Sequence, residues 1–263
     1  MDLQLKGKTA LVTAATAGIG LAIARALAQE GVELAITGRD RATLDMVTAE
    51  LAASSGTGAR GLLADASTPD GAASIARELP AVDILVNNLG TYESKPFGEI
   101  ADADWSRMFE VNVMSGVRLA RSFLPGMLDR DWGRIVFISS ESGLAVPPDM
   151  IHYATTKTAQ LAVSRGLAQL TRGTGVTVNA VLPGPTRAAG IESFLRGQSA
   201  TPDAPLAELE AEFFRTGRSA SIAQRFLEAD EIANLVAFVA SPRSSATNGA
   251  ALRAEGGLVN TIA

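Results

Sequence analysis

Residues 9–29 read TALVTAATAGIGLAIARALAQ. The pattern predicts a buried strand over residues 9–13 and a helix over residues 19–29, which Gly31 closes. The small residues between them let the backbone come close to a phosphate, and the start of a helix offers unpaired N–H groups and a partial positive charge. The stretch therefore predicts the first strand, turn and helix of an α/β fold, with an anion site at the turn.

The same alternation continues along most of the chain. Further strands are predicted over residues 33–37, 62–64, 84–86, 134–138, 177–181 and 250–253. Helices are predicted over residues 41–53, 68–79, 104–130, with an interruption near Pro125-Gly126, and 151–172. Strands alternating with helices of this length predict right-handed βαβ units in a doubly wound, seven-stranded parallel sheet with helices on both faces. We therefore expect a single α/β domain over residues 1–263.

The alternation stops over residues 188–227, where a mixed segment intervenes. Its apolar residues recur at roughly helical spacing: Ile191, Phe194, Leu195, Phe213, Phe214, Ile222 and Phe226. Long insertions of this kind often cover binding pockets, so we expect a substrate lid. The alternative is that these side chains only pack on the body of the domain.

The composition limits the kinds of partner. The net charge is −5 and Lys and Arg form no dense run, which argues against nucleic acid or an anionic membrane as a partner. No stretch approaches the ~18 consecutive apolar residues that span a bilayer, so we expect a cytoplasmic protein. The chain has no cysteine and one histidine, His152, so we expect no thiolate catalysis and no metal site. A small-molecule substrate is the remaining expectation.

Three residues in the middle of the chain indicate proton chemistry. Tyr153 and Lys157 stand four residues apart, and Ser140 precedes the tyrosine by thirteen residues. Residues spaced by four share one face of a helix, so the ammonium would lie near the phenol. A nearby positive charge lowers the pKa of a phenol from its usual value near ~10. The pattern is short and lysine is a common surface residue, so the alternative is a solvated helix face.

The end of the second strand bears on the nucleotide. Dinucleotide sites often carry Asp or Glu there to bind the ribose of NAD, but this chain has Gly38 followed by Arg39. A guanidinium at that place would pair with the 2′-phosphate of NADP, so NADP is expected over NAD. Arg39 could instead be an exposed loop residue beside Asp40, a helix N-cap. Asp65, after the third strand, would bind adenine or cap the next helix.

Together these residues resemble the short-chain dehydrogenase/reductase family in its single-domain form, and are similar to 3-oxoacyl carrier-protein reductases. The resemblance covers nearly the whole chain. The family's phosphate turn is matched by Thr13, Gly18 and Gly20, its N-N-A-G segment by Asn87, Asn88 and Gly90, its helix asparagine by Asn112, its serine by Ser140, its Y-x-x-x-K by Tyr153 and Lys157, and its P-G motif by Pro183 and Gly184.

The resemblance implies a hydride transfer between a nicotinamide cofactor and a carbonyl or secondary alcohol. Tyr153 would exchange the proton, Ser140 would hold the substrate oxygen, and Lys157 would lower the tyrosine pKa and bind the nicotinamide ribose. Asn112 would support a water chain to the lysine. The expected cofactor contacts are Thr13, Thr16, Gly18, Ile19, Gly20, Arg39, Asp65, Asn88, Gly90, Tyr153, Lys157, Pro183, Gly184 and Thr186. The resemblance also implies a homotetramer built through the two long helices.

Two positions depart from the family pattern. Ala14 stands where the phosphate turn has its first glycine, and Leu89 replaces the alanine of N-N-A-G. We expect Ala14 to adopt a negative φ and the turn to be kept. A cofactor-binding sensor with little turnover is the alternative function, but a sensor does not need Ser140, Tyr153 and Lys157. A methyltransferase is disfavoured because such proteins usually have an acidic residue after the second strand.

Overall fold

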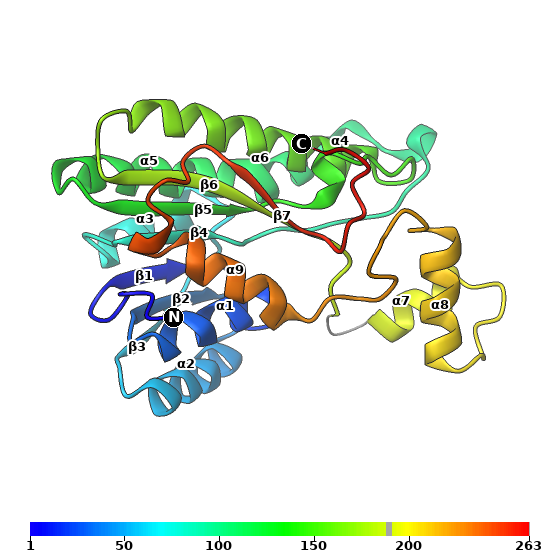
Figure 1. The fold of residues 1–263 in the computed structure, drawn as a ribbon, viewed down its shortest axis with the longest axis horizontal. Helices are drawn as coiled ribbons and strands as arrows, with labels where there is room; N and C mark the ends of the chain where they lie inside the picture. The colour runs from blue at the N-terminus through cyan, green and yellow to red at the C-terminus, as the bar shows by residue number, and fades with distance from the viewer. Residues whose placement is uncertain (188–190, 263) are drawn as a thin grey trace.

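The computed structural model of the chain describes residues 1–187 and 191–262. Within these residues, seven parallel strands form one sheet in the order β3-β2-β1-β4-β5-β6-β7 (Figure 1). The strands are β1 (Thr9–Val12), β2 (Glu33–Gly38), β3 (Ala59–Leu63), β4 (Ile84–Asn87), β5 (Gly133–Ile138), β6 (Val176–Pro183) and β7 (Ala251–Ala254). The doubly wound parallel sheet expected from the sequence is confirmed.

Helices cover both faces of the sheet. They are α1 (Gly18–Gln29), α2 (Arg41–Ser55), α3 (Pro69–Glu78), α4 (Asp102–Phe109), α5 (Ser115–Asp129), α6 (Ile151–Leu170), α7 (Ile191–Gln198), α8 (Leu206–Thr216) and α9 (Ala229–Val239). One core cluster joins α1, α2 and α9 to the sheet, and a second joins α3, α5 and α6 to the opposite face. The sheet is therefore the middle of three layers.

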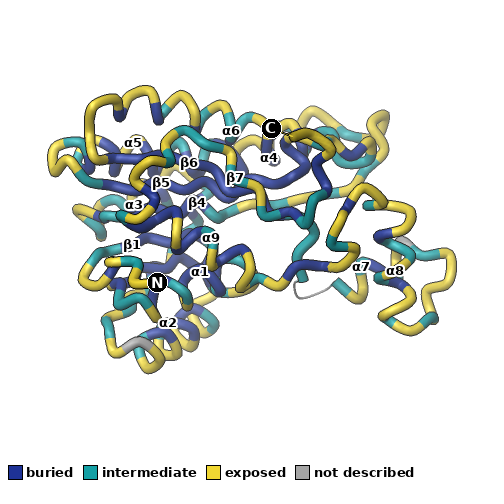
Figure 2. Tube along the Cα trace, in the orientation of Figure 1, coloured by how far each residue is buried: buried dark blue, intermediate teal, exposed yellow. Residues whose placement is uncertain are grey.

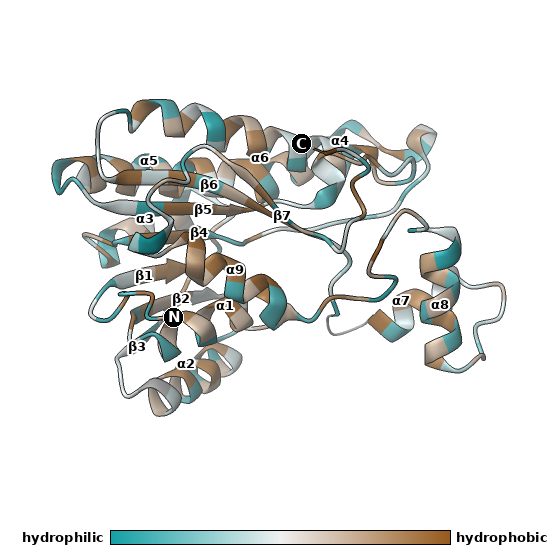
Figure 3. Ribbon diagram, viewed as in Figure 1, coloured by the Kyte–Doolittle hydropathy of each residue, from teal (hydrophilic) through white to brown (hydrophobic). Residues whose placement is uncertain are grey.

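The central strands are buried on both sides, as parallel sheets require. Every residue of β4, β5 and β6 is buried (Figure 2), and these strands are hydrophobic over most of their length (Figure 3). The winding reverses between β1 and β4, which lie side by side in the sheet. In folds of this kind the crevice outside the carboxyl ends of such strands is where ligands bind.

One long helix was expected over residues 104–130, with an interruption near Pro125. The structure places the interruption elsewhere. The helix is not interrupted at Pro125, which lies inside α5. A π-helical turn, Glu110–Met114, instead separates α4 from α5, and the Ser115 N–H donates to the carbonyl of Glu110 across this wider turn. The side chain of Asn112 within it bonds the backbone of Thr91, a contact that spacing rules do not predict.

The mixed segment of the sequence contains α7 and α8, which project beyond one end of the sheet (Figure 1). Four of its side chains, Leu195, Leu209, Phe214 and Phe226, form a small apolar cluster of their own. Phe213 stacks on Phe226 with ring centroids 5.2 Å apart. None of the helices in the described part of the chain combines the length and hydrophobicity needed to cross a membrane.

Candidate active site

The turn after β1 has a left-handed residue at its start. Ala14 has a φ of 52°, so the expectation of a negative φ is wrong. The Ala14 N–H donates to Thr37 Oγ1 at 2.9 Å, and its carbonyl accepts from Asn88 Nδ2 at 3.2 Å. These bonds, with β2 and with the residue that follows β4, hold the turn in the conformation that glycine usually supplies, despite the Cβ atom.

The same turn fits a phosphate group. Gly18 has a φ of +55°, and a Cβ built there would meet nothing within 4 Å, so the space beside it is open. The N-cap of α1, Ala17, provides no side-chain hydrogen bond to the first N–H groups of the helix. These donors and the helix dipole are the elements of an anion site. Thr16, Gly18 and Ile19 are therefore placed where a pyrophosphate would be bound.

Gly20 is required by packing. A Cβ at this position would lie 2.4 Å from Asn88 Nδ2 and 2.5 Å from the carbonyl oxygen of Ala14. Thr13 completes the junction, because its hydroxyl accepts from the N–H groups of Asn88 at 2.9 Å and Leu89 at 3.0 Å. Thr13, Gly20 and Asn88 thus lock the phosphate turn to the end of β4.

The residues after β2 and β3 lie beside this turn. Arg39 is exposed, and a Cβ at Gly38 would lie 2.8 Å from Thr16 Cγ2, so the position before the arginine has no room for an acidic side chain. Asp65 accepts from the Ser67 hydroxyl at 2.6 Å, and this bond, aided by the charge of Arg39, lowers the pKa of Asp65. Thr68, not Asp65, caps the following helix.

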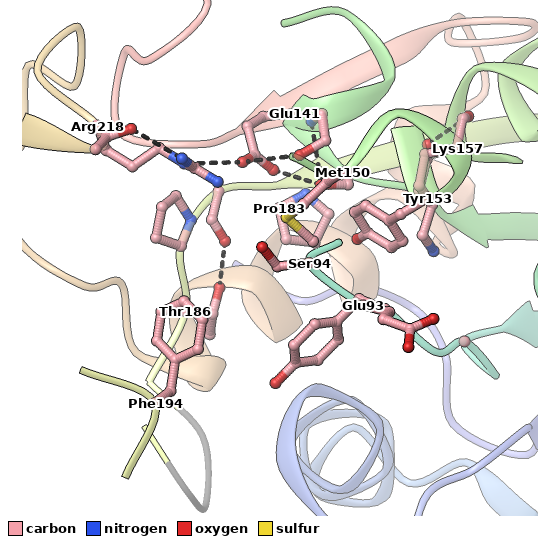
Figure 4. A pocket seen from close by; sticks show the side chains of 18 of the residues that line it. Glu93, Ser94, Glu141, Met150, Tyr153, Lys157, Pro183, Thr186, Phe194 and Arg218 are labelled. Carbon is pink, nitrogen blue, oxygen red and sulfur yellow. Dashed lines mark hydrogen bonds and ion pairs between the residues drawn. The ribbon is translucent and has the colours of Figure 1, made fainter. Parts of the chain in front are cut away.

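Ser140, Tyr153 and Lys157 converge at the carboxyl end of β5. Ser140 lies two residues after the end of the strand, whereas Tyr153 and Lys157 lie on the first two turns of α6. Ser140 and Tyr153 line the same pocket, and the nearby Ser140 hydroxyl acts to lower the pKa of the phenol. Lys157 Nζ lies 5.7 Å from the Tyr153 ring centroid and donates to the carbonyl of Ile138 at 3.0 Å. The phenol oxygen faces the pocket (Figure 4).

The pKa values of these groups differ from the sequence expectation. Burial raises the pKa of Tyr153 above its ordinary value, and the carboxylate of Glu141 raises it further. The Lys157 ammonium, which was expected to lower this pKa, donates to the carbonyl of Ile138. Burial also lowers the pKa of Lys157 to about 8, although Glu141 opposes that change. Tyr153 is therefore held as a neutral phenol, which can donate a proton.

Asn112 lies behind these residues and does not line the pocket. Its amide donates to the Thr91 carbonyl and to Thr156 Oγ1, both at 2.9 Å, and its Oδ1 accepts from the Thr91 N–H at 2.7 Å. Its own carbonyl accepts from Gln160 Nε2 at 2.6 Å. Asn112 therefore fixes the loop after β4 against α6. These bonds were not part of the expectation that Asn112 supports a water chain.

A cavity of about 750 Å³ joins the site to the α7–α8 segment. The expected site residues that line it are Ile19, Asn88, Gly90, Ser140, Tyr153, Lys157, Pro183, Gly184 and Thr186. The remaining ones, Thr13, Thr16, Gly18, Gly20, Arg39, Asp65 and Asn112, lie outside its lining. Phe194, Phe213 and Phe226 form an apolar wall of the cavity.

The loop after β6 forms another wall. Gly184 packs so tightly that a Cβ would lie 2.7 Å from the backbone of Glu255. The Thr186 hydroxyl donates to the Gly184 carbonyl at 2.9 Å, and the next residue, Arg187, pairs with Glu210 and Glu228 at 3.1 Å each. These pairings leave Arg187 committed to α8 and α9, so it is a poor candidate for binding an anionic substrate.

The sequence reasoning missed Glu141. This carboxyl group follows Ser140 in the 3₁₀ turn Glu141–Gly143, is only 5% exposed, and accepts a hydrogen bond from the Ser140 hydroxyl. Its other oxygen lies 4.0 Å from Nε of Arg218 (Figure 4). Nε2 of the single histidine, His152, is 3.5 Å from a carboxylate oxygen of Glu93. An acidic residue next to Ser140, three residues after a buried strand, was the available signal for Glu141.

The family model of short chain dehydrogenases matches residues 8–198. The chain belongs to the short-chain dehydrogenase/reductase family. Two relatives illustrate the match. An uncharacterized oxidoreductase of Bacillus subtilis, YvaG, is 46% identical, with all of both chains covered. The 3-oxoacyl-[acyl-carrier-protein] reductase FabG of Aquifex aeolicus is 32% identical, covering 98% of this chain and 100% of the relative.

A solved structure of this family superposes over the whole chain. It is L-sorbose reductase from Gluconobacter frateurii complexed with NADPH and L-sorbose, with a TM-score of 0.90, 30% identity and full coverage of both chains. Members of this short-chain family are NAD(P)-dependent oxidoreductases, and this chain is an enzyme of that class.

Proposed function

We propose that the protein transfers a hydride between NADP and a substrate that is a carbonyl compound in one direction and a secondary alcohol in the other. The observation that carries the proposal is the convergence of Ser140, Tyr153 and Lys157 on one pocket next to the turn of α1. A proton donor, a second hydroxyl and an ammonium group are what carbonyl reduction requires around the reacting oxygen.

Each of these side chains has a defined task in the proposed reaction. The nicotinamide cofactor, when bound, supplies the hydride. Tyr153 keeps its proton because its pKa is raised, and donates it to the substrate oxygen as that oxygen gains charge. Ser140 hydrogen-bonds the same oxygen. Lys157, fixed by the Ile138 carbonyl at 3.0 Å, places positive charge near the phenolate that forms.

The test of this function is substitution of Tyr153. We expect Tyr153→Phe to lose more than about 100-fold in turnover of carbonyl compounds, since the proton donor is removed. Binding of NADPH, followed by fluorescence, should change little. Tyr92→Phe is the matched control, because it alters the chain's other tyrosine and keeps a ring 6.3 Å from that of Tyr153. Full turnover by Tyr153→Phe would contradict the proposal.

Arg39 supports the preference for NADP. It is the exposed cation beside the phosphate turn, and the neighbouring Gly38 has no space for the acidic side chain that binds the ribose of NAD. The structural relative L-sorbose reductase is complexed with NADPH. We expect Arg39→Ala to weaken NADPH binding by about 10-fold or more and NADH binding little. Arg41→Ala, an exposed arginine paired with Asp45, is the control.

The remaining assignments are proposals of the same kind. We propose that residues 188–227 act as a substrate lid, since Phe194 and Phe213 line the cavity from that segment.

We also propose a homotetramer. An apolar groove between α5 and α6 could serve it, lined by Val117, Arg121, Leu124, Pro125, Val163, Leu167 and Leu170. Light scattering should give four times the chain mass of 27.2 kDa. A monomer mass would refute this assembly.

A further inference from the structure

The two oxygens of the Glu141 carboxylate have different partners. Oε1 accepts from the Ser142 hydroxyl at 3.3 Å and lies 4.0 Å from Nε of Arg218. Oε2 accepts from the Ser140 hydroxyl, which is the only side chain among the described residues that donates to it. The carboxylate is almost completely buried, so solvent is a poor substitute for this donor.

Ser140 has a single proton to donate. In the structure that proton is directed at Glu141, whereas in the proposed reaction it must be directed at the substrate oxygen. When the hydroxyl turns toward the substrate, Oε2 of Glu141 loses its donor. A buried acceptor left without a donor is costly, and an anionic acceptor more so. The substrate that reacts best is therefore one that brings a replacement donor.

We propose that Glu141 is a specificity-determining residue, and that the enzyme prefers α-hydroxy ketones, and vicinal diols in the reverse direction, over plain ketones and alcohols. The inference rests on the proposed function of the same pocket. Because Ser140 Oγ and Glu141 Oε2 are in hydrogen-bond contact, a substrate oxygen held by Ser140 has its neighbouring carbon beside Oε2. A hydroxyl on that carbon then donates to the carboxylate.

The charges around Glu141 favour a neutral donor. Arg218 and Lys157 are the cations of this part of the pocket, and both disfavour a substrate ammonium group. The carboxylate itself disfavours an anion at the same place. Ser142 and Arg218 hold Oε1, so the carboxylate stays in position while Ser140 turns. An uncharged donor remains, and a hydroxyl group is the simplest that a carbonyl substrate can carry on the neighbouring carbon.

The experiment compares isosteric ketones that differ only in this hydroxyl. Hydroxyacetone is matched with butanone, and α-hydroxyacetophenone with propiophenone, because CH₂OH and CH₂CH₃ are similar in size. We expect the wild-type kcat/KM for each hydroxy ketone to exceed that of its partner by at least about 10-fold. In Glu141→Gln the ratio should fall to within about threefold, because the neutral amide accepts more weakly than a carboxylate.

Glu78→Gln is the matched control, since Glu78 lies outside the pocket and pairs with Arg60. It should keep the wild-type ratio. Thermal melting and NADPH binding show whether Glu141→Gln is folded, and the wild-type ratio tests the inference without any variant. Equal kcat/KM values within both wild-type pairs, with clear turnover, would overturn the inference and leave the proposed function standing. Absence of turnover with all four ketones and with a wider carbonyl panel would overturn both.

Discussion

Replacement of Ala14 by glycine should stabilise this enzyme. Ala14 has a φ of 52°, where an L-residue carries a cost of about 1–2 kcal/mol that glycine does not. Glycine gives back about 0.5–1 kcal/mol through the greater entropy of its unfolded chain. The hydrogen bonds to Thr37 and from Asn88 use backbone atoms, so they are unchanged by the substitution. The expected net gain in the free energy of unfolding is about 0.5–1 kcal/mol.

Calorimetry and guanidinium unfolding can measure this gain. For a chain of this size the melting temperature should rise by about 1–4 °C. The control is the same substitution at Ala49, an exposed residue inside α2, where glycine should lower the free energy of unfolding by about 1 kcal/mol. The two variants are thus expected to melt on opposite sides of the wild type. If Ala14→Gly melts at or below the wild-type temperature while Ala49→Gly is destabilised, the strain argument is wrong.

Two further predictions concern stability. Gly20→Ala should lower the free energy of unfolding by about 2–3 kcal/mol and weaken NADPH binding, because the added Cβ would lie 2.4 Å from Asn88 Nδ2. The control is Gly58→Ala, where nothing lies within 4 Å of the added Cβ. In the same denaturant titration this variant should be as stable as the wild type or slightly more stable. Lys157 has a pKa of about 8 when folded and 10.5 as its ordinary value, so between these limits the unfolded chain binds more protons and stability rises with pH. Between about pH 8 and pH 10, the cofactor-free wild type should therefore gain about 1 kcal/mol per pH unit relative to Lys157→Met, and parallel pH profiles of the two would contradict this.

The sheet could be predicted because its strands are buried on both faces. Such strands appear in the sequence as short apolar runs, and β4, β5 and β6 are of this kind. Helix interruptions were harder to place. Proline at position 125 suggested a break, yet the change of helix type occurs at residues 110–114, where a side chain bonds a distant loop. Local sequence carries no information on such a contact.

The candidate site likewise has features that the sequence predicts and features that it does not. Ser140, Tyr153 and Lys157 could be brought together by spacing, because four residues on a helix and the end of a strand have fixed geometry. The conformation of Ala14 could not be predicted in this way, because it is held by hydrogen bonds with Thr37 and Asn88, which lie far along the chain. The direction of the Lys157 ammonium could not be predicted either, because it depends on the carbonyl of Ile138, nineteen residues earlier in the chain.

The separate apolar cluster of α7 and α8 affects how the pocket can change over time. Phe194 and Phe213 face the substrate cavity, but they pack on this small cluster and not on the clusters that bury the sheet. Replacing them alters the shape of the cavity at little expense to the global free energy of unfolding, because the sheet's own packing is untouched. New substrate ranges can therefore arise by mutation in this segment while Ser140, Tyr153 and Lys157 stay in place.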